Sequence, residues 1–275
     1  MKKKKLVPAE IRAFKRKIYG YYRRSGRSFP WRETTDPYRI LVSEIMLQQT
    51  QTHRVLEKYS LFVAAFPDIK ALAAASLGDV LRLWQGLGYN RRAMALKRIA
   101  ELLAEQHKGT LPSSKEELLE LPGIGNSTAS AVLAFAFNKP SAFIETNIRT
   151  VYIHFFFHDK KNVQDSDVLS LVEQTLDKRR PREWYYALMD YGVKLKKEFP
   201  GINKKSAHYK KQSPLEGSNR QIRGRIIKLL AAEGPLPRAE LIRRLKTDAQ
   251  RAGSILHELE MEGFLKRKGS IITLP

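Results

Sequence analysis

The sequence predicts an all-α protein. Apolar residues recur with helical spacing along most of the chain, and the alternating pattern of strands is scarce before residue 264. Hydrophobic residues make up 43% of the chain, which is enough for a packed core and argues against wholesale disorder. A length of 275 residues suits one large domain or two modest ones.

The charge balance is strongly basic. Lys and Arg number 50 against 28 Asp and Glu, for a net charge of +22. Because phosphate neutralisation releases counterions, nucleic acid is the first partner indicated, and an anionic membrane is the second. No apolar run reaches the ~18 residues of a spanning helix. The basic start MKKKKLVPAEIR lacks the apolar segment of a signal peptide. We therefore expect a cytoplasmic protein, nucleoid-associated if prokaryotic, with no membrane partner and with a monomer as the default.

Helical patterns are expected over segments 9–24, 37–50, 53–65, 76–84, 91–107, 114–120, 126–137, 145–157, 165–177 and 181–198. Pro37 suits the first turn of its helix, since its fixed φ favours that position. In this helix Ile40 and Met46 supply buried faces, whereas Glu44 and Gln48 lie four residues apart on another face. Asp-Pro, Phe-Pro and Leu-Pro pairs separate successive helices.

The region after the last of these helices changes character. Lysines crowd the stretch 194–212, which also contains Pro200 and Gly201, and predict a basic linker or loosely ordered arm that extends to residue 218. A solvated charge run is an equal alternative.

Residues 219–275 are expected to form a separate small unit. Helical spacing is found around 222–230, at 236–245 and at 254–262, and GFLKRKGSIITLP then alternates toward strand with a turn at Lys268-Gly269. Three short helices and a basic hairpin resemble a winged helix, a fold that often places its third helix in the DNA major groove. A protein-docking module is the alternative.

The motif LPGIGNSTA (121–129) predicts a tight turn between two helices. Gly123 and Gly125 allow positive φ and close backbone approach. The following helix offers free N–H groups to a phosphate oxygen, and Ser127 and Thr128 add hydroxyls. A Gly-Ile-Gly alone is a weak signal, but the whole motif resembles the helix-hairpin-helix of DNA-repair proteins. That resemblance implies that the turn at 121–126 could hold a monovalent cation bridging to a phosphate.

Five motifs in order carry a wider resemblance: PWRETTDPYRILVSEIMLQQTQ (30–51), WQGLGYNRRA (84–93), LPGIGNSTA (121–129), FIETNIRTV (143–151) and LMDYG (188–192). They resemble the helix-hairpin-helix DNA glycosylases, most closely the adenine branch, over about residues 10–195. The resemblance implies a six-helix domain at 25–135 and a second helical domain built from 1–24 and 136–212. It also implies a base pocket between the two domains.

The resemblance assigns catalysis to two carboxylates. Such enzymes act on a base swung out of the stack, and a purine leaves readily only when a ring nitrogen is protonated. Glu44 matches the family's general acid, against the alternative of an exposed helix residue. Glu145 stands where the family has Asp, the charge that stabilises the cationic sugar or positions water. Its reach is longer by one methylene, about 1 Å, and misplacement of that size can cost ~10²-fold in rate. We expect the pocket to be adjusted to it.

Other residues match positions that contact DNA. Gln48, Gln49 and Tyr89 match positions that push into the duplex beside the extruded base, and the flat Tyr89 ring suits stacking. Core packing is the alternative for Tyr89. Arg91 and Arg92 are expected to meet the phosphate backbone, and Arg149 could instead pair with a carboxylate.

Three features of the sequence narrow the activity and cofactors that the resemblance implies. Ser127 stands where strand-cutting relatives carry the Lys that forms a Schiff base, so the resemblance implies the monofunctional type. The chain has no cysteine, which excludes disulfides and thiolate zinc sites as well as the 4Fe–4S cluster that most relatives hold after LMDYG. We expect no metal site and no cofactor beyond the hairpin cation. Residues 219–275 are too short for the pyrophosphate-hydrolase-like domain with which adenine glycosylases read 8-oxoguanine.

The expected function is therefore removal of a mispaired base from double-stranded DNA, most simply adenine opposite guanine or 8-oxoguanine. A thymine or uracil mismatch glycosylase is one alternative. A catalytically weakened, structure-specific DNA-binding protein is another, because Glu145 replaces Asp.

Overall fold

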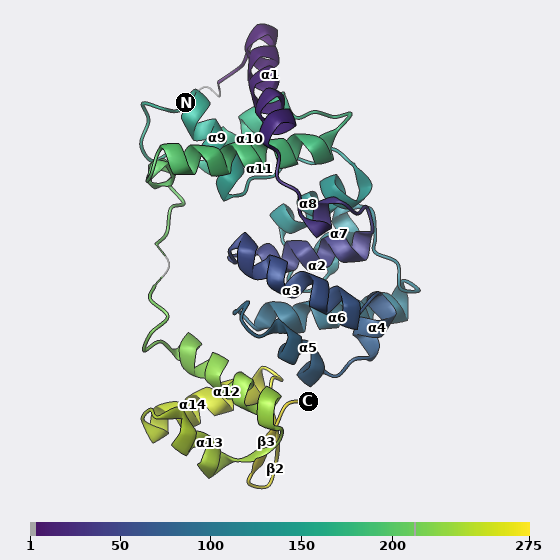
Figure 1. The fold of residues 1–275 in the computed structure, drawn as a ribbon, viewed down its shortest axis with the longest axis vertical. Coiled ribbons are helices and arrows are strands. Elements are labelled where there is room, and N and C mark those ends of the chain that lie inside the picture. The colour runs from purple at the N-terminus through teal and green to yellow at the C-terminus, as the bar shows by residue number, and fades with distance from the viewer. Residues whose placement is uncertain (1–3, 212) are drawn as a thin grey trace. The chain divides into compact units, whose positions relative to one another are not determined.

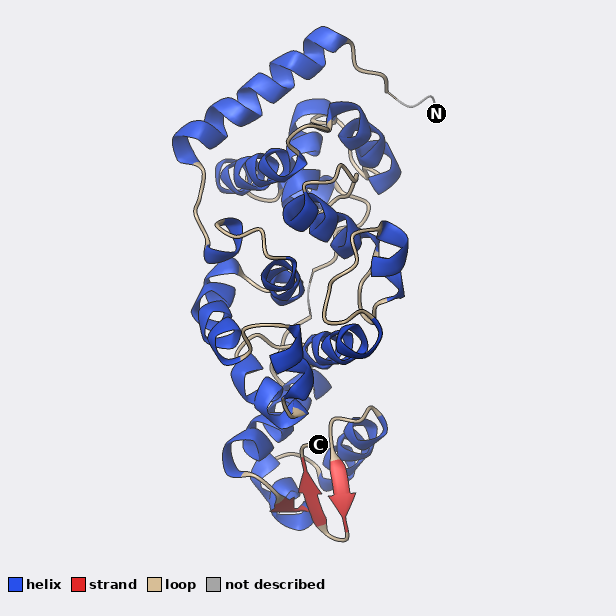
Figure 2. Ribbon diagram, turned by 90° about the vertical axis from the view of Figure 1, so that its right-hand side faces the viewer, coloured by secondary structure: helices blue, strands red, loops and turns tan. Residues whose placement is uncertain are grey.

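The structure is a computed structural model that describes residues 4–211 and 213–275. Residues 1–3, which the predicted second helical domain includes, and residue 212, in the predicted basic arm, lie outside the described residues. The described chain is mostly helical, with one small sheet near the C-terminus (Figures 1 and 2). This confirms the all-α prediction. None of the helices in residues 4–211 and 213–275 combines the length and apolar character needed to span a membrane.

The predicted helices are found within three residues of their expected ends: α1 (Pro8–Ser25), α2 (Pro37–Leu47), α3 (Thr52–Ala65), α5 (Leu77–Trp84), α6 (Arg91–Gln106), α7 (Lys115–Glu120), α8 (Asn126–Phe137), α9 (Thr146–Phe156), α10 (Asp165–Thr175) and α11 (Pro181–Glu198). Helix α4 (Ile69–Ala74) was not predicted, because its sequence IKALAA has a single polar residue and shows little contrast between an apolar and a polar face. Asp68 begins α4 by accepting a hydrogen bond from the Ala71 N–H. Two short 3-10 turns, η1 (Pro30–Arg32) and η2 (Ile202–Lys205), also lie in this part of the chain.

The described chain divides into two compact units. Within the described residues, unit 1 comprises 4–41, 113–120 and 124–211, and unit 2 comprises 42–112, 121–123 and 213–275. This division differs from the expected domains at 25–135, at 1–24 with 136–212, and at 219–275. Helices α7 and α8 belong to unit 1 because α8 packs against both α7 and α11. The C-terminal segment belongs to unit 2 because its first helix packs against α5.

Unit 1 is built around α11, which packs against α9, α1 and α8. Its core is aromatic: Trp184, Tyr185 and Tyr152 are fully buried. Phe14 of α1 packs edge-on against Trp184, with ring centroids 5.7 Å apart. This packing fixes the long helix that carries the LMDYG motif.

The basic stretch after LMDYG is more ordered than predicted. Residues 194–198 form the last turn of α11, and η2 follows with Ile202 buried. A parallel bridge then joins Val163 to Ser206: the Val163 N–H donates to the Lys205 carbonyl (2.8 Å), and the Ala207 N–H donates to the Val163 carbonyl (2.9 Å). The expected loose arm is therefore wrong for residues 194–207, because backbone pairing and apolar burial hold them.

Unit 2 contains α3 to α6 and a C-terminal winged helix. The latter consists of α12 (Asn219–Glu233), β1 (Leu236–Pro237), α13 (Arg238–Leu245), α14 (Ala249–Met261), β2 (Lys266–Lys268) and β3 (Ile271–Thr273). The three strands pair antiparallel in the order β1-β3-β2. This confirms the winged-helix prediction. The turn between β2 and β3 is Gly269-Ser270, one residue after the predicted Lys268-Gly269, because Lys268 pairs with Ile271 as the last residue of β2.

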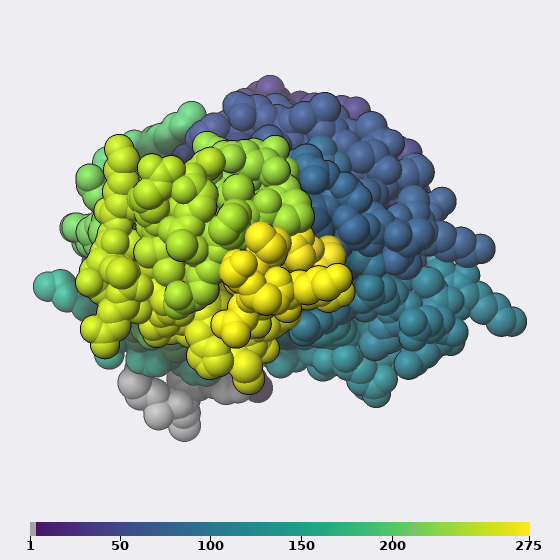
Figure 3. All heavy atoms as spheres, turned by 90° about the horizontal axis from the view of Figure 1, so that it is seen from below, coloured from purple at the N-terminus to yellow at the C-terminus, as the bar shows by residue number. Residues whose placement is uncertain are grey.

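The winged helix packs on the helices before it in unit 2. Helix α12 lies against α5, and the Arg82 Nε donates to the Ala231 carbonyl at 3.0 Å. Figure 3 shows the green and yellow surface of residues 219–275 adjoining the blue surface of α3 to α6. The winged helix therefore belongs to the same compact unit as the α5–α6 turn.

Candidate functional site

The predicted site residues are divided between the two units. Unit 2 contains Glu44, Gln48, Gln49, Tyr89, Arg91 and Gly123, and unit 1 contains Gly125, Ser127, Thr128 and Glu145. No group of His, Asp or Glu that could hold a metal ion occurs among the described residues. Each cluster has its own geometry.

The hairpin motif forms the expected tight turn between α7 and α8. Gly123 has φ +78°, and a Cβ there would lie 3.0 Å from the Ala95 Cβ, so this position requires glycine. Gly125 begins α8 in an extended conformation with φ −97°, and a Cβ there would meet nothing within 4 Å. The first turn of α8 is therefore open at its N–H end. Ser127 is exposed there, and its Oγ donates a long hydrogen bond of 3.4 Å to the Ile144 carbonyl.

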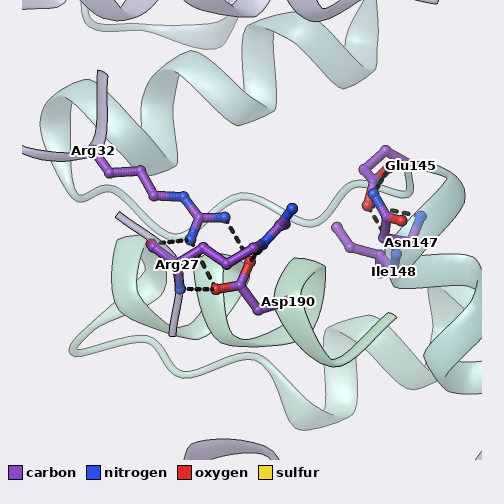
Figure 4. A network of polar contacts seen from close by, with 6 residues as sticks. All are labelled: Arg27, Arg32, Glu145, Asn147, Ile148 and Asp190. Atoms are coloured by element: carbon purple, nitrogen blue, oxygen red, sulfur yellow. Dashed lines mark hydrogen bonds and ion pairs between the residues drawn. The ribbon is translucent and has the colours of Figure 1, made fainter. Parts of the chain in front are cut away.

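Glu145 caps the N-terminus of α9 (Figure 4). One carboxylate oxygen accepts hydrogen bonds from the backbone N–H groups of Asn147 (2.8 Å) and Ile148 (2.9 Å). The other accepts from the Asn147 side-chain amide at 3.1 Å. A charge in this position is stabilised by the helix dipole, and the longer side chain still reaches both N–H groups. The extra methylene is therefore absorbed by folding the carboxylate back onto its own helix.

The glycine of LMDYG sets where that helix begins. A Cβ at Gly192 would lie 2.3 Å from the Asn147 carbonyl oxygen, so only glycine lets α11 approach the first turn of α9 this closely. Because Glu145 precedes that turn directly, the α9–α11 contact also places the Glu145 carboxylate. Gly192 is thus a positioning residue that the motif contained but the sequence reasoning did not single out.

Two further residues of α11 shape this cluster. Asp190 is buried and accepts hydrogen bonds from Arg27 through its backbone and side chain, both at 2.8 Å, and from both terminal nitrogens of Arg32 at 2.9 and 3.0 Å (Figure 4). It ties the segment before α2 to α11. Burial lowers the pKa of Lys196, and the nearby Glu145 charge opposes this by raising it. The contacts of Asp190 and Lys196 were not predicted from the sequence, although Asp190 and its partner Arg32 each lie in a motif.

In unit 2, Glu44 occupies a half-buried position on α2, one turn before Gln48. Its neighbours Val42, Ser43 and Ile45 are buried. The position is therefore neither the open surface of a solvated helix residue nor the core.

Arg92 differs from its predicted role at the phosphate backbone. Its guanidinium is half-buried and donates to oxygen atoms from two turns of the chain: the carbonyls of Ile45 (2.8 Å), Met46 (2.9 Å), Gln48 (2.5 Å), Leu87 (3.2 Å) and Gly88 (3.1 Å), and the Thr50 hydroxyl (2.9 Å). Burial lowers the pKa of Arg92 to about 10, so it stays charged at neutral pH. Arg92 therefore caps the end of α2 and fastens it to the α5–α6 turn.

That clamp brings Gln49 and Tyr89 into neighbouring turns. Both adopt left-handed backbone conformations, with φ +52° and +47°, which are uncommon for residues other than glycine and concentrate at functional sites. The half-buried Tyr89 ring lies between the guanidinium groups of Arg92 and Arg220, at 5.6 and 5.5 Å from its centroid. Arg220 also donates to the Tyr89 hydroxyl at 3.0 Å. Tyr89 is therefore not a core residue.

Arg91 has a protein partner as well, and its predicted contact with the phosphate backbone stays a prediction. It forms a bidentate ion pair with Glu262 of the winged helix, at 2.9 and 2.7 Å, and Glu262 also pairs with Arg223 at 2.6 Å. These partners hold the pKa of Glu262 down at about 2, against the desolvation that would raise it. Arg91 thus joins two parts of unit 2. Arg149 pairs with Asp165 at 2.6 and 2.7 Å, which confirms the structural alternative for it.

Comparison with known proteins agrees with these features. Residues 42–177 match the HhH-GPD superfamily of base excision DNA repair proteins, and residues 210–269 match the DprA winged helix domain. An adenine DNA glycosylase of Mycobacterium tuberculosis is 33% identical over 275 aligned residues, which cover 91% of this chain and 89% of that protein.

Other relatives match a shorter part. The human adenine DNA glycosylase is 33% identical over 67% of this chain, and 36% of its own length is covered. The adenine DNA glycosylase of Buchnera aphidicola subsp. Baizongia pistaciae is 36% identical over 66% of this chain. The chain spans about half the length, 52%, of that relative.

Among solved structures, a thermostable thymine-DNA glycosylase superposes with a TM-score of 0.61 at 26% identity, covering 73% of this chain and 97% of that one. An endonuclease III–DNA complex at 20% identity, with a TM-score of 0.54, shares the fold. With its helix-hairpin-helix, its capped α9 and a relative matched over nearly its whole length, the chain belongs to the HhH-GPD superfamily of base excision DNA repair proteins.

Proposed function

We propose that this protein is a monofunctional DNA N-glycosylase that removes adenine mispaired with guanine or 8-oxoguanine. The observation that carries the proposal is the match over 89% of the length of a relative named adenine DNA glycosylase. The two carboxylates at the matching motif positions, Glu44 and Glu145, support the same reaction. Double-stranded DNA is the substrate, and the chain acts as a monomer.

In this proposal Glu44 is the general acid. The target adenine is swung out of the duplex, and the Glu44 carboxyl protonates a ring nitrogen so that the base departs as a neutral purine. Glu44 is half-buried on α2, beside the buried Val42 and Ile45, and the proposed role requires its carboxyl to carry the proton when the base departs.

Glu145 stabilises the cationic sugar left by the departing base. Its carboxylate is held in place by three hydrogen bonds from α9, so its charge needs little reorganisation during the reaction. Ser127 carries no amine and cannot form a Schiff base with the sugar. A water molecule adds to the cationic sugar carbon and loses a proton, so the product is an abasic site with an intact strand.

The protein is proposed to work without an iron–sulfur cluster. The chain has no cysteine, so its residues do not fit the cluster that most relatives hold after LMDYG. The Val163–Ser206 bridge and buried Ile202 hold that segment instead. The hairpin at 121–126 is proposed to bind a monovalent cation that contacts a DNA phosphate.

One assay tests the proposal. The protein is incubated with labelled duplexes that contain A:8-oxoG, A:G, T:G or U:G, and abasic strands are then cleaved with alkali. Cleavage confined to the adenine strand is expected. Cleavage at T:G would favour a thymine glycosylase, an alternative kept by the structural match to a protein of that name. Tight binding without base loss from any duplex would favour a DNA-binding protein that has lost catalysis.

A matched pair of variants then tests the acid. Glu44→Gln keeps the shape of the side chain but cannot donate a proton, and it should abolish adenine release. Glu57→Gln, which makes the same change at an exposed position on α3, should leave the rate unchanged. If Glu44→Gln released adenine as fast as Glu57→Gln, the general acid would be a residue other than Glu44.

A further inference from the structure

A groove in unit 2 lies between the winged helix and the α5–α6 turn. It has a volume of about 720 Å³, and its walls come from α12 on one side and from residues 85–91 on the other, with Gln49 and Tyr89 on its border. This volume is within the range of ligand sites, roughly 300–1,000 Å³. The groove therefore adjoins the two residues that match the family's base-contacting positions.

The groove carries positive charge that the protein does not neutralise. Arg54, Arg225 and Lys228 line it and are exposed, and the side chain of none of them forms an ion pair or a hydrogen bond within residues 4–211 and 213–275. By contrast, Arg223 in the same wall pairs with Glu262 and Glu258. Three uncompensated cations in one groove indicate an anionic ligand with repeated charges.

Glycines leave the groove open to a close ligand. Gly224 lies within α12, where glycine weakens a helix relative to alanine. A Cβ there would meet nothing within 4 Å, so internal packing does not explain the glycine. Gly88 lines the opposite wall, and a Cβ there would also meet nothing. Bare backbone on both walls suits the close approach of a sugar–phosphate chain.

The third helix of the winged helix is poorly suited to DNA. Helix α14 carries Glu258 and Glu260, and Glu262 follows directly at its C-cap. Its one arginine, Arg251, donates to the Asn219 side chain (2.7 and 2.9 Å) and to the Gly217 carbonyl (2.7 Å). An acidic helix repels phosphate, so the usual docking with the third helix in the major groove is disfavoured.

We propose that the winged helix grips the sugar–phosphate backbone of duplex DNA with its first helix, α12, in the groove that α12 forms with the α5–α6 turn. Arg54, Arg225 and Lys228 neutralise successive phosphates, and Gly224 admits the backbone. The winged helix thereby lengthens the DNA-binding surface around Tyr89 and does not read bases with α14. This inference rests on the proposed function in that the ligand is DNA.

The test compares two double variants of the full chain with the same change in net charge. Arg225→Glu/Lys228→Glu reverses two groove charges, and Lys266→Glu/Lys268→Glu reverses two charges on the exposed strand β2 of the wing. Dissociation constants are measured on a plain duplex at several salt concentrations. The groove variant should bind on the order of 10-fold more weakly, and its salt slope should fall by about 1.8, because each lost phosphate contact removes about 0.9. The wing variant should bind within about 2-fold of the unaltered protein.

A second pair of variants changes shape without charge. Gly224→Gln fills the groove, so DNA affinity should fall at least about threefold, as for the loss of one phosphate contact. Glutamine also has a higher helix propensity than glycine, so the melting temperature should not fall. Gly20→Gln, inside α1, is the matched control and should not change affinity. Circular dichroism verifies folding for each variant.

The outcomes separate this inference from the proposed function. Equal losses in the groove and wing variants, or unchanged affinity in the groove variant or in Gly224→Gln, would overturn the groove. If the unaltered protein excises bases and the groove variant binds DNA as tightly as the unaltered protein, the proposed groove is wrong and the glycosylase proposal stands. Weakened binding by the groove variant, with no excision from any duplex by the unaltered protein, would support the groove and overturn the glycosylase.

Discussion

Glu145 has one structural role, as the cap of α9, and one proposed catalytic role, and substitutions at this position separate the two. Its carboxylate caps α9 through two backbone N–H groups, and its charge is proposed to stabilise the cationic sugar. Glu145→Ala removes both the cap and the charge. Glu145→Gln keeps an oxygen that can accept from both N–H groups but removes the charge, and Glu145→Asp keeps both with a shorter reach.

The expected stabilities follow from these contacts. Loss of the cap in Glu145→Ala should cost about 1 kcal/mol of unfolding free energy. For a chain of this size that corresponds to a fall of about 2–4 °C in melting temperature. Glu145→Gln should cost about 0.3–1 kcal/mol, since only the interaction of the charge with the helix dipole is lost. Glu145→Asp should be as stable as the unaltered protein, because Asp is a preferred cap.

The expected rates follow a different order. Glu145→Ala and Glu145→Gln should both lose about 10²–10³-fold in the single-turnover rate of adenine release, because neither supplies the charge. Glu145→Asp should lose on the order of 10-fold, since its carboxylate is withdrawn by about 1 Å from a pocket adjusted to Glu. Denaturant unfolding and single-turnover excision measure the two series.

Two results would refute this reasoning. A Glu145→Gln variant as fast as the unaltered protein, beside a slow Glu145→Ala variant, would show that Glu145 acts only as a cap. A Glu145→Asp variant faster than the unaltered protein would show that the native carboxylate is poorly placed and that the pocket is not adjusted to it.

Three other predictions concern neighbouring features. Ser127→Lys should place an amine at the exposed start of α8, and borohydride should then trap a covalent adduct of this variant with DNA. The unaltered protein should give no adduct. Absence of the adduct in the variant would contradict the match of residue 127 to the Schiff-base lysine of strand-cutting relatives. Gly192→Ala should cost about 1–3 kcal/mol in denaturant unfolding and lower the excision rate, because its Cβ would lie 2.3 Å from the Asn147 carbonyl; unchanged stability would contradict the close helix contact. The pKa of Glu262 is lowered from 4.5 to about 2, so its stabilising contribution should be complete above about pH 4.5 and disappear as the pH falls toward 2. The melting temperatures of the unaltered protein and Glu262→Gln should converge over that range, and a constant difference would argue against the ion pairs.

Much of the fold could be predicted because its signals are local. Helical periodicity located every long helix, and Pro37 and the glycines of the hairpin marked where helices begin. Helix α4 was missed although α7, equally short, was predicted, because IKALAA has one polar residue and little amphipathic contrast, whereas KEELLE has four charged residues. The basic stretch after LMDYG was predicted as a loose arm because charge is visible in a sequence, whereas its pairing with Val163 is not.

The candidate site was predicted only in part, for a related reason. Motif positions identified Glu44, Glu145 and Ser127, since residue type alone decides whether a side chain can donate a proton, carry a charge or form a Schiff base. The neighbours Arg91 and Arg92 were assigned one role together. The structure gives them two, because adjacent residues on a helix point in different directions.

By itself, the sequence determined the helical class, the family, the chemical groups available for catalysis and the lack of cysteine ligands. Tertiary structure alone decided that Arg92 clamps α2 to the turn of Tyr89, that Arg91 binds the winged helix, and that Gly192 positions the start of α9. Local backbone preference and side-chain chemistry belong to single residues and short segments, so they can be read along the chain. Buried hydrogen bonds and close helix contacts join residues far apart in sequence, and their partners are set only when the core packs.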